Sequence, residues 1–355
     1  MERRGFVALP LLAAPLAAAN SGDRRVFGYG DGIPHTPAEY AALLGRLTQA
    51  PNFVADNYSL GGVVEQLEQR MAAMLGKEAA VWMPTGTLAN HMAVRLLAGN
   101  RRRVLVQAES HLFNDCGDCA QTLSQLHLVP LALGTATFRL AEVEQAHADA
   151  MSGRVEVPIG AIQIETPVRR RRGEMFEFAE MQKVSAWARG KGIGMHLDGA
   201  RLFLECAYTR RSVKEYSALF DTVYISQYKY FNASGGAILA GPKALLQNLF
   251  HTRRMFGGGV HEAWPSAAVS LHYLDGYEGR LRVAVENAEK VFARVPVERV
   301  LNGTNIFRLK AAVTEGDVRR MAAAGVMLRP GGALQVNETW ARQGADDLVK
   351  AFESS

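Results

Sequence analysis

The stretch His196-Leu197-Asp198-Gly199-Ala200-Arg201, with Lys229 further along the chain, decides the fold. An acid, an arginine three positions later and a downstream lysine are the side chains that can hold an aldehyde cofactor. A lysine amine forms a Schiff base with a carbonyl group. A carboxylate can pair with the ring nitrogen of pyridoxal phosphate (PLP), and an arginine offers a planar fork of donors to a nearby oxygen.

Buried strands are expected directly before the acid and the lysine. Residues 192–197 form an apolar run after a glycine-rich turn, which is typical of a parallel strand. Residues 220–226 form a second such run, and Lys229 follows it. Open α/β sheets bind ligands at the carboxyl ends of their strands, so Asp198 and Lys229 are expected at one crevice. Taken singly, each is better explained as a helix cap or a loop lysine, and the upstream motifs shift that balance.

Two upstream motifs supply a phosphate site and an aromatic ring. Thr85-Gly86-Thr87 follows the apolar run 79–82 and opens a helical pattern. A strand, a short polar turn and a helix start can bind phosphate through free backbone N–H groups, although an ordinary threonine cap looks the same. His111 follows the strand-like residues 103–106, where an imidazole can stack on a pyridine ring. The order of these motifs favours a PLP site.

In this order the motifs resemble the PLP-dependent threonine aldolase and aromatic amino acid β-eliminating lyase family, of fold type I. Residues 76–80 and 253–259 also match, and the resemblance runs from about residue 52 to about residue 270. It implies an α/β fold with a mostly parallel central sheet, helices on both faces and a smaller C-terminal α+β domain. It also implies PLP as the cofactor and an amino acid as the substrate.

The resemblance assigns the cofactor-binding residues one by one. Gly86 and Thr87 are expected to bind the cofactor phosphate. His111 is expected to stack on the ring, and Asp198 is expected to pair with the ring nitrogen. No metal is implied.

Three basic residues complete the implied site. Lys229 is expected to carry the cofactor as a Schiff base and then to act as an acid and base. Arg201 is expected beside the phenolic oxygen of the cofactor or the substrate carboxylate. Arg254 matches a basic position near the phosphate that can reach across a dimer interface. The family builds its active sites between subunits, so a homodimer or homotetramer is implied.

The substrate half of the pattern departs from the family. Residues 27–32 lack the Arg-Ser pair of the threonine aldolase segment Arg-Ser-Asp. Val168 stands where the family has a histidine linked to the substrate β-hydroxyl group. His261 and Gln335 stand at two arginine positions, although Arg329 is close to the second. The pattern therefore specifies the cofactor better than the reaction.

We predict a PLP-dependent lyase that cleaves the Cα–Cβ bond of a β-hydroxy amino acid or eliminates a β-substituent. Amino-group transfer, racemisation or decarboxylation on the same scaffold stays open, as does a non-catalytic binding protein. The retained Lys229, Asp198 and Arg201 argue against the binding protein, whereas the missing carboxylate arginines argue for it. The arginine run 169–172 is either a solvated loop, the simpler reading, or a replacement anion grip.

Length and composition agree with an enzyme of two unequal domains. The 355 residues are 48% hydrophobic and 21% charged, with a net charge of +5. Zinc-type spacing and basic helices with interleaved aromatic residues are missing, so nucleic acid is not an expected partner. No apolar stretch beyond the N-terminus is long enough to span a bilayer. We expect an arm at 26–60, a large PLP-binding domain at 61–270, and a linking helix with a small domain at 271–355, with continuous helix over 263–291.

The first residues resemble a targeting signal. Arg3 and Arg4 precede an apolar run that ends at Ala17-Ala18-Ala19, a possible cleavage site. Residues 1–25 therefore predict twin-arginine export and a periplasmic location. The alternative is a disordered alanine-rich leader on a cytoplasmic enzyme.

Cys116 and Cys119 form a C-x-x-C motif shortly after His111. Three cysteines do not make a disulfide framework. The pair is a redox couple, a disulfide, or simply two small residues near a helix start, and the last of these is the plainest interpretation.

Overall fold

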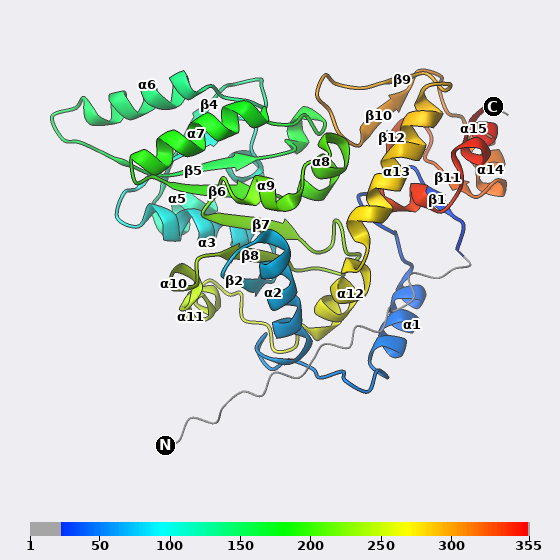
Figure 1. The fold of residues 1–355 in the computed structure, drawn as a ribbon, viewed down its shortest axis with the longest axis horizontal. Helices are drawn as coiled ribbons and strands as arrows, with labels where there is room; N and C mark the ends of the chain where they lie inside the picture. Colours follow the sequence, from blue (N-terminus) through cyan, green and yellow to red (C-terminus); the bar gives the residue numbers. More distant parts are fainter. Residues whose placement is uncertain (1–22, 354–355) are drawn as a thin grey trace.

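The computed structural model describes residues 23–353, and a seven-stranded sheet lies at its centre (Figure 1). The strand order is β2 (Ala79–Met83), β8 (Ala237–Gly241), β7 (Thr222–Ser226), β6 (Gly194–Asp198), β5 (Ile159–Glu165), β3 (Arg103–Gln107) and β4 (His127–Leu131). The strands from β7 to β4 are parallel, whereas β8 is antiparallel to both neighbours. The predicted fold class, a mostly parallel sheet of fold type I, is confirmed.

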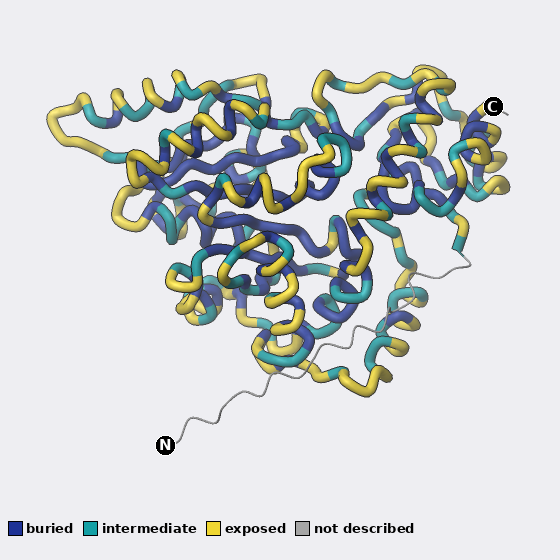
Figure 2. The backbone as a smooth tube through the Cα atoms, viewed as in Figure 1, coloured by how far each residue is buried: buried dark blue, intermediate teal, exposed yellow. Residues whose placement is uncertain are grey.

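Helices cover both faces of this sheet. Successive strand residues point to opposite faces, so Val104 and Val106 join one core cluster and Leu105 joins the other. One face is covered by α3 (Gly86–Ala98), α4 (His111–Asn114), α5 (Cys119–Ser124), α10 (Lys243–Leu246) and α11 (Leu249–Met255). The other is covered by α2 (Gly62–Leu75), α6 (Leu140–Met151), α7 (Phe178–Gly190), α8 (Leu202–Thr209), α9 (Val213–Ser217) and α12 (Trp264–Leu274). Figure 2 shows the strands between these layers as buried.

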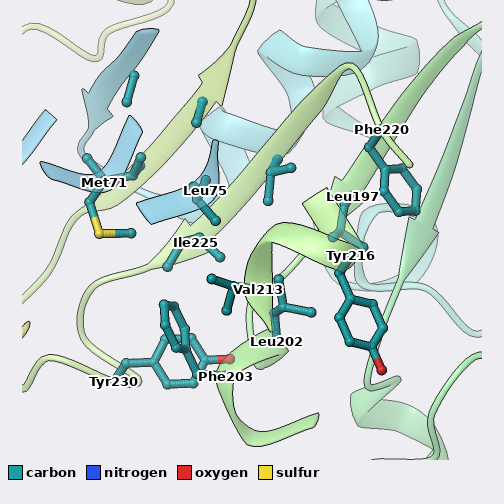
Figure 3. Close-up of a cluster of buried hydrophobic side chains, with 14 of the residues drawn as sticks. Met71, Leu75, Leu197, Leu202, Phe203, Val213, Tyr216, Phe220, Ile225 and Tyr230 are labelled. Carbon is teal, nitrogen blue, oxygen red and sulfur yellow. The ribbon is translucent and has the colours of Figure 1, made fainter. Parts of the chain in front are cut away.

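The larger core cluster anchors the chain on both sides of the predicted lysine (Figure 3). Met71 of α2, Leu197 of β6 and Ile225 of β7 belong to this cluster. Tyr230 is fully buried, and its ring meets that of Phe203 edge to face with centroids 5.2 Å apart. Burying an apolar side chain such as Phe203 contributes about 1.5–3 kcal/mol. Because Tyr230 follows Lys229 directly, this packing fixes the lysine's backbone.

A second core joins the two ends of the described chain. β1 (Val26–Phe27) pairs in parallel with β11 (Val326–Met327), so the N-terminal segment packs into the C-terminal region. A three-stranded sheet of β9 (Val297–Glu298), β10 (Ile306–Leu309) and β12 (Ala333–Gln335) lies beside it. The helices there are α13 (Tyr277–Phe292), α14 (Glu315–Ala323), η2 (Glu338–Ala341) and α15 (Ala345–Glu353).

The helix expected over 263–291 is divided in two. α12 ends at Leu274 and α13 starts at Tyr277, with Gly276 between them at a φ of +67°, a left-handed conformation that ends an α-helix. The remaining elements are α1 (Pro37–Leu47) and η1 (Arg169–Arg171). No helix within residues 23–353 is long and apolar enough to cross a membrane. The twin-arginine motif predicted near the N-terminus lies outside the described residues.

Candidate active site

A cavity of about 450 Å³ opens at the carboxyl ends of β5, β6 and β7. Six of the seven residues assigned from the sequence line it, namely Gly86, Thr87, His111, Asp198, Arg201 and Lys229. Residues that the sequence did not single out also line it, including Glu165, Tyr224, Tyr228 and the segment 234–236. The fold therefore brings the scattered motifs to one place, at the edge of the sheet where ligands are expected.

Asp198 is the last residue of β6 and only 1% exposed. Its Oδ2 accepts a hydrogen bond from Nδ2 of Asn90 at 2.5 Å, and its Oδ1 accepts one from the backbone N–H of Ala200 at 3.1 Å. Both donors are uncharged. A buried carboxylate held by neutral donors is poised to pair with a cation in the cavity.

A buried relay runs from Asp198 through Asn90 to His196. The amide N–H of Asn90 faces the carboxylate, so its Oδ1 faces Nε2 of His196, 2.8 Å away. Nε2 must then carry the imidazole proton, and Nδ1 accepts from the hydroxyl of Thr222 at 2.9 Å. Burial lowers the pKa of His196 to about 4, which keeps the ring neutral.

Sequence reasoning missed both Asn90 and His196 as parts of the site. Residues 196 and 198 alternate along one strand, so their side chains share a face of the sheet. That spacing is the signal that could have identified the histidine. Asn90 comes from α3 on the facing layer, and the sequence does not show that contact.

Lys229 lies in the turn after β7 and lines the cavity. Burial, and then the positive charge of Arg201, lower its pKa to about 8. An amine with this pKa is partly neutral near neutral pH, and the neutral amine is the form that attacks carbonyl carbon.

Arg201 ties the N-terminal segment to the site. Its guanidinium, in a residue 8% exposed, donates from Nε to Oδ1 of Asp31 at 3.2 Å and from Nη2 to Oδ2 at 2.7 Å. This bidentate pair uses two of its N–H donors. The predicted role of Arg201 beside a ligand therefore depends on its remaining donors.

The turn between β2 and α3 has the strand, turn and helix order that the sequence predicts. Thr85 caps α3, and its Oγ1 accepts from the backbone N–H of Leu88 at 3.1 Å. A Cβ atom at Gly86 would collide with the hydroxyl group of Tyr224, so only glycine lets the start of α3 approach that side chain this closely. The free N–H groups at the start of α3 and its dipole favour an anion there.

His111 begins α4 and is held by two side chains. Its backbone N–H donates to Oε2 of Glu165 at 2.5 Å, and its Nδ1 lies 3.2 Å from Sγ of Cys116. The hydrogen bond with Cys116 is the main cause that raises the pKa of His111. Burial, and then the charge of Asp198, raise the pKa of Glu165. Glu165 was not predicted as a site residue, although it ends a buried strand beside Asp198.

One residue of the arginine run faces the cavity. Arg169 lines it, while its Nη2 donates to Asp115 at 2.9 Å. Arg171 pairs with Glu174 at 3.0 Å on the surface of the loop. Val168 is fully buried. The two interpretations of this run, a solvated loop and an anion grip, therefore apply to different members of it.

Arg254 is not among the residues that line the cavity of its own chain. Its guanidinium lies over the ring of Tyr58, 4.8 Å from the centroid, and His261 packs edge-on against the same ring at 5.0 Å. Gln335 accepts from the backbone N–H of Gly30 at 2.6 Å, and Arg329 covers the ring of Tyr29 at 4.5 Å.

Comparisons with known proteins show the family and the fold of the chain. Residues 52–305 match the model of the beta-eliminating lyase family. The chain is 28% identical to the low specificity L-threonine aldolase of Saccharomyces cerevisiae, over 71% of this chain and 67% of the yeast protein. It is 30% identical to the aldolase vrtJ of Penicillium aethiopicum, over 63% of this chain and 56% of that protein. The matches thus span between about half and two thirds of these relatives.

A solved structure extends the likeness over nearly the whole chain. A Listeria monocytogenes protein described as an L-allo-threonine aldolase superposes with a TM-score of 0.74 at 26% sequence identity. The superposition covers 94% of this chain and 97% of that one. The likeness includes the C-terminal region, which the matched family segment does not cover in full.

Proposed function

Because the chain belongs to the beta-eliminating lyase family, we propose that it is a PLP-dependent lyase acting on an amino acid. The reaction is Cα–Cβ cleavage of a β-hydroxy amino acid, or β-elimination. One observation carries the proposal: Lys229 and Asp198 line a single cavity with the glycine turn at the start of α3. An amine, a carboxylate and a phosphate site are the three anchors of PLP.

The residues present fit this cofactor. Gly86 and Thr87 line the cavity at the start of α3, where free backbone N–H groups suit a phosphate group. The buried carboxylate of Asp198, held by neutral donors, suits a protonated ring nitrogen. Bound PLP supplies an electron sink that stabilises negative charge at the substrate carbon.

The chain's own residues position and move protons around that carbon. Lys229, with its pKa lowered to about 8, can release and take up a proton at Nζ near neutral pH. His111 lines the cavity with Nδ1 engaged by Cys116, which leaves Nε2 for the substrate. Since Val168 and His261 do not line the cavity, we assign to His111 the proton of the β-hydroxyl group.

Arg169 is our candidate for the substrate carboxylate. Arg201 already binds Asp31 with two donors, whereas the guanidinium of Arg169 binds Asp115 through Nη2 alone and the Arg169 side chain is 47% exposed. Its position at the cavity lets a carboxylate compete for the remaining N–H donors. Carboxylate binding by Arg169 would replace that of the family arginines that the chain lacks.

A direct test uses the colour of the protein. Protein purified with PLP should show the visible absorption band of a lysine-bound cofactor, and Lys229→Ala should remove that band. We expect β-hydroxy amino acids to release glycine and an aldehyde. A colourless protein that ignores added PLP would overturn the proposal. A coloured protein that releases no glycine would point to β-elimination, measured as keto acid and ammonia, and the absence of those products would point to another PLP reaction.

We also propose that the enzyme is a homodimer or homotetramer. Arg254 lies near an exposed surface that includes Tyr58, 39% exposed, and Met255, 69% exposed. A second copy that covers this surface would bring Arg254 toward a phosphate site. Sedimentation equilibrium tests this, and a monomer at enzyme-assay concentrations would contradict it.

We further propose twin-arginine export, on the evidence of Arg3 and Arg4 before an apolar run. Residues 1–25 fused to a reporter that folds in the cytoplasm should carry it to the periplasm. Changing both arginines to lysine should stop that transport. Equal cytoplasmic retention of both fusions would contradict the proposal and leave a cytoplasmic enzyme.

A further inference from the structure

Cys116 and Cys119 lie at the two ends of a tight turn between α4 and α5. Gly117 and Asp118, the central residues, have φ values of +57° and +50°, and the N–H of Cys119 donates to the carbonyl of Cys116 at 3.3 Å. Two positive φ values and this hydrogen bond define a type I′ turn, whose end Cα atoms lie within about 7 Å. A disulfide bridges Cα atoms about 4.4–6.8 Å apart. The backbone therefore holds the two cysteines at bridging distance.

The two thiols are chemically unequal. They share a hydrogen bond that raises the pKa of Cys116 and lowers that of Cys119. Cys119 is partly exposed at the start of α5, whereas Cys116 is 9% exposed. A reachable thiol with a lowered pKa beside a buried partner is the arrangement of an attacking and a resolving cysteine.

The buried member of the pair touches the active site. Sγ of Cys116 lies 3.2 Å from Nδ1 of His111 and 3.8 Å from Oγ1 of Thr87. Both neighbours line the cavity. A change in the bonding of this sulfur therefore reaches the imidazole directly.

We propose that Cys116 and Cys119 form a reversible dithiol–disulfide pair that responds to small-molecule disulfides, and that its oxidation detaches His111 from the Cys116 thiol. The proposal goes beyond the lyase activity. The thiol or disulfide state of Cys116 and Cys119 can be measured in the resting protein, without any substrate. The proposal assigns the C-x-x-C motif a role that neither the cofactor nor the substrate requires.

The exchange balances with a glutathione-type disulfide as oxidant. The Cys119 thiolate attacks one sulfur of that disulfide, whose S–S bond breaks to release one small thiol, protonated from water. Cys116 then passes its proton to Nδ1 of His111 and attacks Sγ of Cys119, which breaks the mixed disulfide and expels the second small thiolate. That thiolate takes the proton from the imidazole and leaves as the thiol. Two protein thiols are oxidised, and one small disulfide is reduced to two thiols. Excess small thiol reverses both steps.

Oxidation has a defined electrostatic consequence at the imidazole. The disulfide sulfur has no proton to share, so the main cause of the raised pKa of His111 disappears. We therefore expect the pKa of His111 to fall in the oxidised protein. A lower fraction of protonated imidazole would change the pH profile of any reaction in which His111 moves a proton.

To test this, the full-length holoprotein is equilibrated with mixtures of reduced and oxidised glutathione. Free thiols are then alkylated, and the mass of the intact protein is measured. We expect two fewer alkylated cysteines in oxidising mixtures, peptides linked between residues 116 and 119, and recovery with excess thiol. Cys206→Ser should oxidise like the parent protein. Cys119→Ser should keep basal activity but should no longer form the disulfide in oxidising mixtures. Cys119→Ala repeats this test if the serine variant folds poorly.

The second measurement follows the His111 imidazole by NMR in reduced and oxidised protein. We expect its titration midpoint to fall on oxidation in the parent protein and to stay fixed in Cys119→Ser. A pair that stays fully alkylatable in the most oxidising mixture, or that stops at a stable glutathione adduct, overturns the disulfide. A disulfide that leaves the His111 titration unmoved overturns the link to the site. Neither readout requires turnover, so a failed lyase assignment would not affect them.

Discussion

The floor and the rim of the cavity are held in different ways. The floor consists of Asp198 and the two side chains behind it, Asn90 and His196. All three are buried, and hydrogen bonds join them between β6 and α3. The rim consists of loop residues such as Arg169, which is about half exposed and shares its charge with a surface acid. Sheet packing preorganises the floor before any ligand arrives, whereas the rim can change partners when a substrate enters. We therefore propose that the floor specifies the cofactor, and that the rim selects the substrate and the bond that breaks.

The largest expected effect comes from neutralising the floor. Asp198→Asn keeps the shape of the side chain but removes the charge that we propose pairs with the ring nitrogen of the cofactor. We expect kcat to fall on the order of 10²–10³-fold, as for loss of one preorganised electrostatic contact in an active site. KM should change little. Steady-state kinetics measures both, and a variant with unchanged kcat would show that the floor charge does not serve the reaction.

The relay behind Asp198 gives a smaller effect, on stability. Asn90→Leu leaves Oδ2 of Asp198 and Nε2 of His196 without their hydrogen-bond partner. An unsatisfied buried polar group costs about 1–3 kcal/mol, so the free energy of unfolding should fall by an amount in this range. Denaturant unfolding of the protein without PLP measures this loss. Gln145→Leu, which changes an exposed amide on α6, is the matched control and should change stability little.

The rim should respond in KM rather than in kcat. Arg169→Met removes the proposed carboxylate grip, and we expect KM to rise about tenfold, the lower range for a hydrogen bond to a charged group, because the side chain is half exposed. Arg170→Met is the matched control, since Arg170 contacts the same Asp115 but does not line the cavity. Equal effects of the two substitutions would contradict a specific role for Arg169.

The same contrast explains what the sequence could predict. Buried parallel strands are recognisable from apolar runs, so the ends of β6 and β7, and with them Asp198 and Lys229, could be placed in advance. Contacts between layers, such as Asn90 to His196, depend on helix packing that no local pattern records. The loop after β5 was ambiguous because one arginine of the run faces the cavity and its neighbours face solvent. The break between α12 and α13 was missed because the apolar pattern continues on both sides of Gly276.

The smallest expected effect is on the pH dependence of PLP attachment to Lys229. It tests whether a rim residue, Arg169, influences this lysine. Burial and Arg201 lower the pKa of Lys229 to about 8, so its neutral amine becomes abundant as pH rises through this value. The initial rate at which added PLP develops the visible band on PLP-free protein should rise about fivefold from pH 7 to 8 and then level off. With an unperturbed lysine, the rate would keep rising about tenfold per pH unit up to pH 10.

Arg201→Met should move the pH midpoint of this rate upward, since it removes one of the two main causes that lower the pKa of Lys229. Arg169→Met should leave the midpoint in place. If Arg169→Met moved this pH midpoint instead, the charge of Arg169, and not burial and Arg201, would set the reactivity of Lys229.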